Sequence, residues 1–335
     1  MSYLVQKFGG TSVGDLERIE NVAGIIASEV RKNNKVIAIV SAMSGETNRL
    51  VEQVKKTSPV YDGREYDVIV STGENITAGL LAIKLQDLGI PARSWMGWQI
   101  PIITTSMHSN ARILEIKTEN IEKKFAEGMK VAIVSGFQGI SKENRISTLG
   151  RGGSDTTAVA ISAAFNAKRC DIFTDVEGIF TTDPRIVKSA RKLDKISYEE
   201  MLELASMGAK VLHTRSVELA MRYDVNLQVL SSFQEKIGTL VCREDKMLES
   251  RMISGVASSK DEAKVTLSGV LDKPGIAAAI FGPLSESGIN VDMIIQNVSE
   301  NETTDITFSC PMSQVSEAEA AINAASKKKE ISFNA

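Results

Sequence analysis

The sequence is poor in the residues that build disulfide frameworks, zinc sites and nucleic-acid surfaces. It has 3 cysteines in 335 residues, widely spaced and without a CxxC pair, which favours buried thiols in a reducing compartment. Its 2 histidines argue against a histidine-based zinc site. The formal net charge of -3 argues against a nucleic-acid surface, which needs a basic excess. We therefore expect no metal site made by the protein alone, and any metal to be a hard cation held by carboxylates and substrate phosphates.

Long apolar runs are missing as well. The run VIAIV at 36–40 is far too short to span a bilayer. The N-terminal stretch MSYLVQKFGG lacks the basic region, apolar core and cleavage site of a secretory signal. Hydrophobic residues make up 43% of the chain and charged residues 24%, as in soluble globular proteins. These features predict a cytoplasmic protein without membrane or nucleic-acid partners, long enough for two domains.

Residues 1–243 alternate β-branched runs with amphipathic helical stretches. Several of the runs are apolar throughout, as in strands covered on both faces. The repetition of strand and helix predicts an α/β domain with a mostly parallel sheet, helices on both faces, and ligands beyond the carboxyl ends of the strands. Strands are expected at 3–8, 35–43, 67–72, 131–137, 170–175 and 226–232. A helix is expected between the first two strands, with one face marked by Ile19, Val22, Ala23, Ile26 and Val30, and further helices at 74–89 and 199–223, the last broken near Gly208.

The pattern changes after residue 243. Residues 244–261 begin as a charged linker, and residues 262–335 alternate in the order βαββαβ, which predicts a small ferredoxin-like domain. Its final strand is expected in EISFNA at 330–335.

The loop KFGGTSVGD at 7–15 follows the first predicted strand and opens the first helix. Gly9 and Gly10 allow a backbone to approach an anion closely, and the helix N-terminus offers free N–H groups. Lys7 can supply positive charge to a phosphoryl group. The stretch is neither a Walker A motif nor GxGxxG. A tight turn with a surface lysine explains it equally well.

Two further loops carry short polar side chains. SAMSGETN places Ser41, Ser44 and Thr47 after the second strand, where they can donate to a carboxylate or phosphate, or where Ser44 can cap a helix. STGE places Glu74 at a helix start, where it complements the helix dipole or binds a substrate ammonium group.

The run GRGGSD at 150–155 combines both signs of charge in a turn with little bulk. Arg151 can bind a carboxylate with two hydrogen bonds, and Asp155 can accept from an amino group or a lysine. Together they suit a zwitterion. The alternative is an Arg151–Asp155 ion pair that stiffens the loop, with Ser154 or Asp155 as helix N-cap.

The run CDIFTDVEGIFTTDPR at 170–185 ends a strand in polar residues that can bind nucleotide hydroxyls, phosphates and magnesium. The alternative for its Asp183-Pro184 pair is simple turn initiation. GAKVLH at 208–213 adds Lys210, which is otherwise an exposed lysine.

In order and spacing, KFGGTSV, SAMSGETN, STGE, TLGRGGSDTTA, DIFTDVEGIFTTDPR and GAKVLH resemble the aspartate kinase family. That family has the amino-acid kinase fold, a three-layer α/β/α sandwich. LDKPGIAAAIFGPLSESGINVDMIIQNVS resembles the first of its two regulatory ACT modules. The resemblance covers essentially the whole chain, and the combination is far more specific than any single motif.

The resemblance implies ATP-dependent phosphorylation of the β-carboxylate of L-aspartate, with Mg²⁺, as the first step towards lysine, threonine and methionine. The β-carboxylate is already ionised at neutral pH, so attack on the γ-phosphorus needs no general base. Implied catalytic residues are Lys7 and Asp155, the latter orienting either Lys7 or the substrate ammonium. Implied ATP-binding residues are Lys7, Phe8, Gly9, Gly10, Thr174, Asp175, Phe180, Arg185 and Lys210, with Phe180 standing where many relatives have tyrosine. Implied aspartate-binding residues are Ser41, Thr47, Glu74, Arg151, Gly152, Gly153 and Ser154.

The ACT resemblance implies an allosteric site for lysine, threonine or both, formed between modules of neighbouring chains. It also implies a homo-oligomer or pairing with a regulatory subunit. Asp-Lys-Pro-Gly is good turn chemistry in any protein, so turn formation is the alternative for Asp272 and Asn290. Residues 252–259, MISGVASS, resemble the opening strand of a second module, whose larger part would follow the first. Implied effector residues are Asp272, Gly275, Ala277, Asn290, Asp292 and Gln296.

Other reactions and roles compete with this interpretation. A carboxylate kinase of the same fold acting on glutamate or N-acetylglutamate would lack the appended effector module. A non-catalytic amino-acid sensor would be expected to lose Lys7, Arg151 or Asp155, and all three are present. A dinucleotide-dependent dehydrogenase is excluded because no strand is followed by GxGxxG.

Overall fold

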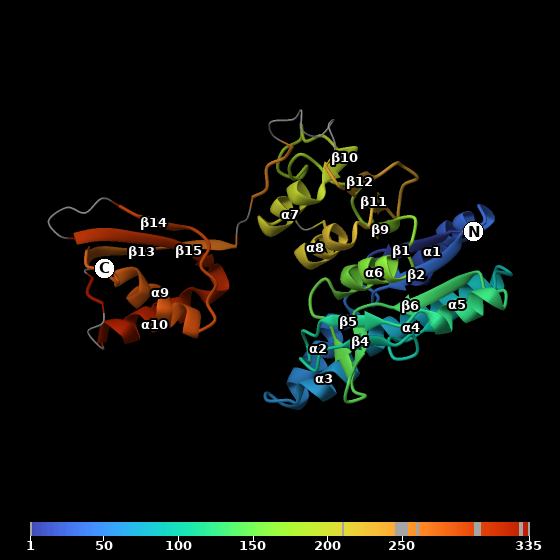
Figure 1. The fold of residues 1–335 in the computed structure, drawn as a ribbon, viewed down its shortest axis with the longest axis horizontal. Coiled ribbons are helices and arrows are strands. Elements are labelled where there is room, and N and C mark those ends of the chain that lie inside the picture. The colour runs from blue at the N-terminus through green and yellow to red at the C-terminus, as the bar shows by residue number, and fades with distance from the viewer. Residues whose placement is uncertain are drawn as a thin grey trace. The chain divides into compact units, whose positions relative to one another are not determined.

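The computed structural model describes residues 2–209, 211–244, 254–258, 261–297, 303–327 and 331–333. The chain divides into two compact units, Met1–Ala257 and Ser258–Ala335, shown in Figure 1 and described separately below. All three cysteines are free and buried, as the sequence predicted.

The larger unit is built on an eight-stranded sheet in the order β10-β12-β11-β9-β1-β2-β6-β3. Neighbouring strands are parallel except for the antiparallel pair β11 and β12. The strands are β1 (Tyr3–Phe8), β2 (Lys35–Val40), β3 (Ala92–Trp95), β6 (Val131–Ser135), β9 (Cys170–Thr174), β10 (Lys195–Ser197), β11 (Leu227–Ser231) and β12 (Thr239–Cys242). The predicted mostly parallel sheet is confirmed.

Helices cover both faces of this sheet and give the predicted three layers (Figure 1). On one face, α1 and α4 pack their apolar stripes against β1, β2 and β6. On the other, α5, α6, α7 and α8 bury theirs in a second core. The helices are α1 (Leu16–Arg31), α2 (Glu46–Thr57), α3 (Gly63–Val70), α4 (Thr72–Asp87), α5 (Glu119–Ala126), α6 (Gly153–Ala164), α7 (Tyr198–Ser206) and α8 (Thr214–Tyr223).

A second, four-stranded sheet was not predicted from the sequence. Its order is β5-β4-β7-β8, and its strands are only three or four residues long. β8 leads directly into the glycine-rich loop before α6. The strands are β4 (Ile102–Thr104), β5 (Ile113–Ile116), β7 (Gln138–Ser141) and β8 (Ile146–Thr148).

The strand predicted at 67–72 is wrong, because these residues form the end of α3 and the start of α4. The run DVIVST has the β-branched composition of a strand. However, Asp62 caps the helix by accepting from the backbone N–H of Arg64. Asp67 and Val70, three residues apart, are both buried, which is helical spacing. Local capping and tertiary burial therefore override strand propensity here.

Within the described residues, one helical stretch, Gly63–Asp87, has the length and apolar composition of a membrane span. Half of it is buried inside the unit, where α4 packs on α1 and the sheet. A core helix of a globular domain has the same composition, so the stretch is weak support for a membrane location.

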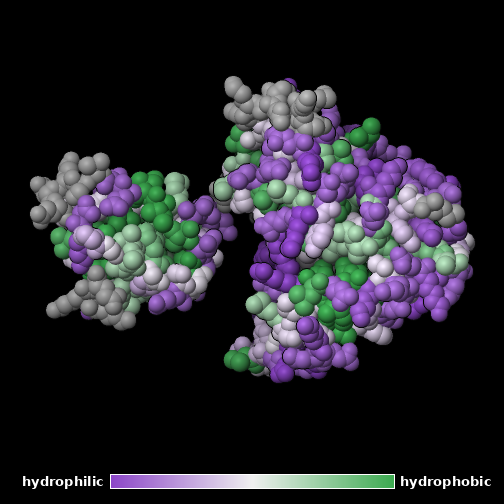
Figure 2. Space-filling model, in the orientation of Figure 1, coloured by the Kyte–Doolittle hydropathy of each residue, from purple (hydrophilic) through white to green (hydrophobic). Residues whose placement is uncertain are grey.

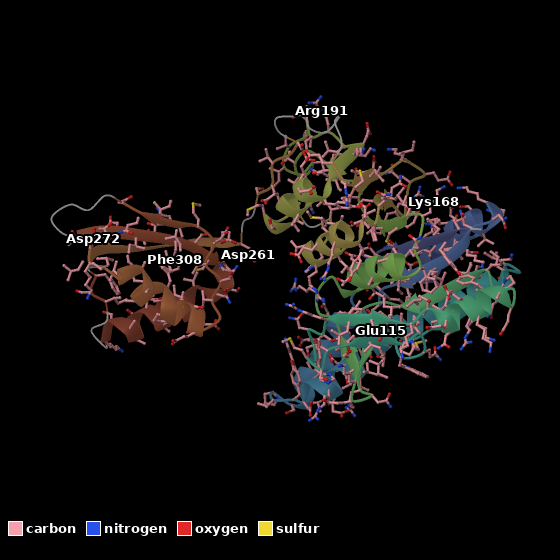
Figure 3. The ribbon with its side chains drawn as sticks, viewed as in Figure 1. Glu115, Lys168, Arg191, Asp261, Asp272 and Phe308 are labelled. Carbon is pink, nitrogen blue, oxygen red and sulfur yellow. The ribbon has the colours of Figure 1, made fainter. Side chains whose placement is uncertain are left out.

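The smaller unit is a three-stranded antiparallel sheet, in the order β13-β15-β14, with two helices packed on it. Phe308, labelled in Figure 3, is 1% exposed and meets Phe281 of α9 edge-on. Residues 331–333 of the predicted last strand form no strand, and the rest of it lies outside the described residues. The elements are β13 (Glu262–Leu271), α9 (Ile276–Glu286), β14 (Ile294–Gln296), β15 (Thr303–Pro311), a 3-10 turn (Met312–Gln314) and α10 (Val315–Lys327).

Of the segment between the domains, 244–261, the structure describes residues 244, 254–258 and 261, and 254–258 form no strand. The backbone N–H of Val256 donates to the carbonyl of Thr181, so this segment runs along the larger unit. The remainder of the strand expected at 252–259 lies outside the described residues. Figure 2 shows that the visible face of the larger unit is mostly hydrophilic, with hydrophobic residues gathered near its middle.

Candidate active site

The carboxyl ends of β1, β2 and β9 meet at one edge of the main sheet. Phe8, the last residue of β1, is in register with Val40 of β2 and Phe173 of β9. The chain stays bonded just past the strands, since Gly9 donates to Phe173 and Ser41 donates to Phe8. The loops that follow these three strands are therefore brought together, as expected for ligand binding in an α/β sheet.

Lys7 and Asp155 form an ion pair at this edge. Their Nζ and Oδ1 atoms are 2.6 Å apart, and the side chains are 12% and 13% exposed. Lys7 comes from β1 and Asp155 from the first turn of α6. The predicted alternative, an Arg151–Asp155 pair, does not form.

The N-terminus of α6 is open to an anion. Its N-cap is Gly152, which has φ 68° and offers no side-chain cap. A Cβ at Gly152 would lie 2.4 Å from Cγ of His213, so only glycine fits. The N–H of Gly153 donates to the carbonyl of Gly150, so the next N–H groups, those of Ser154 and Asp155, and the helix dipole remain for a negatively charged ligand.

Gly10 permits a second close approach of backbone, in the loop after β1. A Cβ there would lie 2.9 Å from the carbonyl oxygen of Ala42. The loops after β1 and β2 therefore pack backbone to backbone. Asp15 ends this stretch by capping α1, where it accepts from the N–H of Arg18.

Glu74 is a buried carboxyl in the first turn of α4, with 3% of its surface exposed. Burial raises its pKa to about 7, against the partial opposition of the hydrogen bond that the N–H of Ala42 donates to Oε1. Its other oxygen, Oε2, is buried without a hydrogen-bond partner among the described residues. A buried acceptor left open in this way can receive a cationic donor.

Arg151 has the opposite character. It is exposed in the loop between β8 and α6, and no ion pair or hydrogen bond of its side chain occurs among the described residues. Its guanidinium is free to bind a carboxylate with two hydrogen bonds. Ser154, by contrast, is buried at the start of α6.

In the loop after β2, the structure contradicts the predicted capping role of Ser44. The N-cap of α2 is Gly45, with φ 83°, so the alternative role of Ser44 as helix cap is wrong. Ser41 and Thr47 are both half-buried, Ser41 directly after β2 and Thr47 in the first turn of α2.

Among the described residues, those predicted to bind nucleotide show fewer mutual contacts than the residues predicted to bind the transferring phosphate. Thr174 ends β9 and donates to the exposed Asp175, 3.2 Å away. Phe180 is half-buried in the following loop. Arg185 is 85% exposed, and its guanidinium binds Asp183, whose carbonyl also closes the predicted turn. Lys210 lies outside the described residues.

The predicted effector residues occupy two regions of the smaller unit. Asp272 and Gly275 follow β13, and Gly275 caps α9 with φ 89° (Asp272 is labelled in Figure 3). Asp292 instead bonds to Ser309, which pairs with Lys264 near the start of β13. Asp272 lies eight residue steps along the chain from Lys264, or roughly 25 Å in strand conformation. The remaining three, Ala277, Asn290 and Gln296, are exposed.

Sequence reasoning missed a second buried carboxylate, Asp67, which is 0% exposed in α3. It accepts hydrogen bonds from Thr148 and from the backbone of Ser109, and it contacts His108. The available signal was an acid at the head of the apolar run DVIV.

Comparison with known proteins relates both units to characterised families. Residues 2–231 match the amino acid kinase family and residues 265–328 match the ACT domain. An aspartate kinase of Pseudomonas putida is 50% identical over 323 residues, which are 96% of this chain and 78% of that protein.

Two solved structures are similar along most of the chain. E. coli aspartokinase III in complex with aspartate and ADP has a TM-score of 0.75 at 28% identity, over 91% of this chain and 78% of that one. The same enzyme in complex with lysine and aspartate has a TM-score of 0.78 at 27% identity, over 96% and 83%.

The raised pKa of Glu74 predicts a pH-dependent stability. The folded state holds this proton more tightly than the unfolded state does, so stability falls as pH rises from 4.5 to about 7. Above that range the destabilisation amounts to at most about 3 kcal/mol. Glu74→Gln mimics the protonated form, and we expect it to raise the melting temperature at pH 8 but not at pH 4.5.

Thermal unfolding of the purified protein at both pH values measures this effect. The exposed Glu115 (Figure 3) provides the control, because Glu115→Gln should change neither melting temperature. A Glu74→Gln variant that is no more stable than the parent at pH 8 would contradict the prediction.

Proposed function

We propose roles for these residues from the premise that the chain belongs to the amino acid kinase family, among its aspartate kinases. Such enzymes transfer the γ-phosphoryl group of ATP to the side-chain carboxylate of aspartate, a step of amino-acid biosynthesis. The ACT domain adds allosteric regulation. Two observations carry the assignment of roles: the Lys7–Asp155 pair, and the burial of Glu74 with one carboxylate oxygen unpaired among the described residues.

Lys7 holds the transferring phosphoryl group together with the backbone of Gly9 and Gly10. Its ammonium stands at the end of the central strand with limited exposure, where a positive charge is screened little by water. The uncapped N-terminus of α6 faces the same edge of the sheet and adds partial positive charge. Asp155 orients Lys7, since the two are in direct contact.

Arg151 and Glu74 bind the two charged groups on the α-carbon of the acceptor. Arg151 receives the α-carboxylate, and Oε2 of Glu74 receives the ammonium group, which supplies the hydrogen bond that the buried oxygen lacks. Ser41, Thr47 and Ser154 are hydroxyl donors from the neighbouring loops. Gly152 and Gly153 would meet the acceptor through their backbone, since His213 and Phe137 fill the space where side chains at these positions would lie.

The reaction then needs positioning and charge neutralisation rather than a protein nucleophile. An ionised β-carboxylate attacks the γ-phosphorus in line, and no proton has to be removed. Lys7 neutralises charge that develops on the transferred group. Thr174, Asp175, Phe180, Arg185 and Lys210 serve the nucleotide, for which Arg185 must exchange Asp183 for a phosphate.

Mg²⁺ suits this site as a companion of ATP. Among the described residues, no three acidic, histidine or cysteine side chains gather as a metal cluster. Mg²⁺ commonly keeps waters and phosphate oxygens and takes one or two carboxylates, so an exposed acid such as Asp175 is sufficient. When bound, the ion neutralises phosphate charge.

Lysine is the proposed effector, alone or with threonine, in the ACT domain. The proposal draws on the lysine complex of the E. coli relative and on the exposure of Asp272, Asn290 and Asp292. We also propose that ACT modules assemble into oligomers, with another copy or a regulatory subunit, and that the protein works in the cytoplasm.

A substrate and effector panel tests the acceptor. ADP release should depend on aspartate. Glutamate and N-acetylglutamate should give less than about a hundredth of its kcat/KM, because the extra methylene displaces the side-chain carboxylate from the γ-phosphorus, and because acetylation removes the ammonium group that Glu74 binds. Added lysine should inhibit. Equal rates with glutamate would refute the acceptor assignment.

Lys7→Ala should lower kcat by about 100- to 1,000-fold while changing the KM for ATP much less, because the ammonium acts mainly on the transition state. The control is Lys84→Ala, which removes another paired lysine, 28% exposed, on α4. Steady-state rates at saturating ATP measure both. A Lys7→Ala enzyme that keeps more than a tenth of its kcat contradicts the role.

The pH profile of kcat/KM for aspartate tests Glu74. This parameter reports the free enzyme, in which the pKa of Glu74 is about 7. The ionised form binds the ammonium, so kcat/KM should rise with pH and level off above that value. Glu74→Gln should flatten the rise and lower the plateau, and an unchanged inflection in this variant would count against the assignment.

A further inference from the structure

Asp67 is a fully buried carboxylate, and its side-chain hydrogen bonds among the described residues come from the segments next to the acceptor loop, residues 149–152, which carries Arg151. The hydroxyl of Thr148 donates to Oδ1 over 2.5 Å. The backbone N–H of Ser109 donates to the carboxylate over 3.1 Å. Nδ1 of His108 lies 2.7 Å from Oδ2. A buried carboxylate with this many hydrogen-bond partners fixes both the distances to those partners and their orientations.

The partners of Asp67 hold the loop that carries Arg151. Thr148 is the last residue of β8, three residues before Arg151 in the chain. Its carbonyl accepts from Ala111, so the 108–111 segment is tied to the same point. On the far side, the guanidinium of Arg215 donates to the carbonyls of Leu149 and Ala111. The acceptor loop therefore begins at the end of β8, which these hydrogen bonds hold in place.

Asp67 is equally close to the helix that carries Glu74. Its own carbonyl accepts from the N–H of Ser71, where α3 passes into α4. Gln138, the partner of Thr148 in the β7–β8 ladder, donates to the carbonyl of Ser71 and to the side chain of Asn75. Two paired residues of one hairpin thus bond to both helices at the α3–α4 junction: Thr148 to α3, and Gln138 to the junction and to α4.

We propose that Asp67 is a positioning residue for the acceptor, which fixes the separation between Arg151 and Glu74 through Thr148 and the α3–α4 junction. The proposal rests on the function proposed above, in which Arg151 binds the α-carboxylate of aspartate and Glu74 binds its ammonium group. Asp67 itself touches no substrate. Its effect is on the distance between two charged groups, on separate segments, that hold the α-carboxylate and the ammonium group of one small molecule and so orient its β-carboxylate.

The most informative substitution leaves Asp67 in place. Removing this buried carboxylate would leave several buried donors without a hydrogen-bond acceptor, and the variant could fail to fold. Thr148→Val keeps the size and shape of the side chain and removes one of the hydrogen bonds. We expect it to raise the KM for aspartate about tenfold and to leave the KM for ATP within about twofold. Thr148→Ser retains the hydroxyl and should restore the parental KM for aspartate.

The matched control is Thr104→Val. Thr104 is also fully buried in the same small sheet, and its hydroxyl is bonded to that of Ser147 over 2.6 Å, away from Asp67. The substitution should lower the melting temperature about as much as Thr148→Val does, without changing the KM for aspartate. A purely structural role for Thr148 would make the two variants kinetically alike.

Arg151→Lys distinguishes the proposed role of Arg151 in binding aspartate from the proposed role of Asp67 in positioning it. Lysine keeps the charge but cannot bind a carboxylate with two parallel hydrogen bonds. If Arg151→Lys raises the KM for aspartate and Thr148→Val behaves like Thr104→Val, the link through Asp67 is overturned alone. If Arg151→Lys leaves that KM unchanged, the acceptor assignment falls, and the role of Asp67 falls with it.

Discussion

The ion pair between Lys7 and Asp155 joins the two loops on which the site depends. One partner stands on the central strand and the other in the first turn of α6, and both are mostly shielded from water. A charge in such a place is costly when unpaired, so the pair holds β1 and the start of α6 in contact. The glycine loop after β1 and the glycine loop before α6 are thereby tied to the same edge of the sheet. In-line transfer requires this arrangement, because donor and acceptor must approach along one axis.

Two buried carboxylates near these loops show how hydrogen bonding separates a structural acid from a binding one. Asp67 is fully buried and accepts from Thr148 and the backbone of Ser109, so its charge is satisfied within the fold. Glu74 is almost as buried, yet Oε2 has no partner among the described residues and its pKa rises to about 7. The fold therefore tolerates an unfavourable group at Glu74, and an incoming ammonium relieves it. Activity and stability oppose each other at this residue.

The sequence predicted most of the main sheet because its strands are apolar on both faces, as in VIAIV at 36–40. It failed at 67–72, where the same composition forms a helix because of the cap at Asp62 and the burial of Asp67. It named Lys7, Arg151 and Asp155 as chemically suited, but it left the partner of Asp155 open. Ion-pair partners are tertiary facts, and no local pattern encodes them. The short strands β4, β5, β7 and β8 escaped for a related reason, since three or four residues carry too little periodicity.

In the smaller unit, the distance between two proposed effector residues limits what a single ligand can contact. Asp272 follows the end of β13, whereas Asp292 is bonded beside the start of that strand, roughly 25 Å away along the chain's rise. A single amino acid is far shorter than that, so one effector molecule cannot contact both within one module. If both bind effector, as the proposal holds, each must be completed by residues of another module. Effector binding and assembly would then be thermodynamically linked, each strengthening the other by the same free energy.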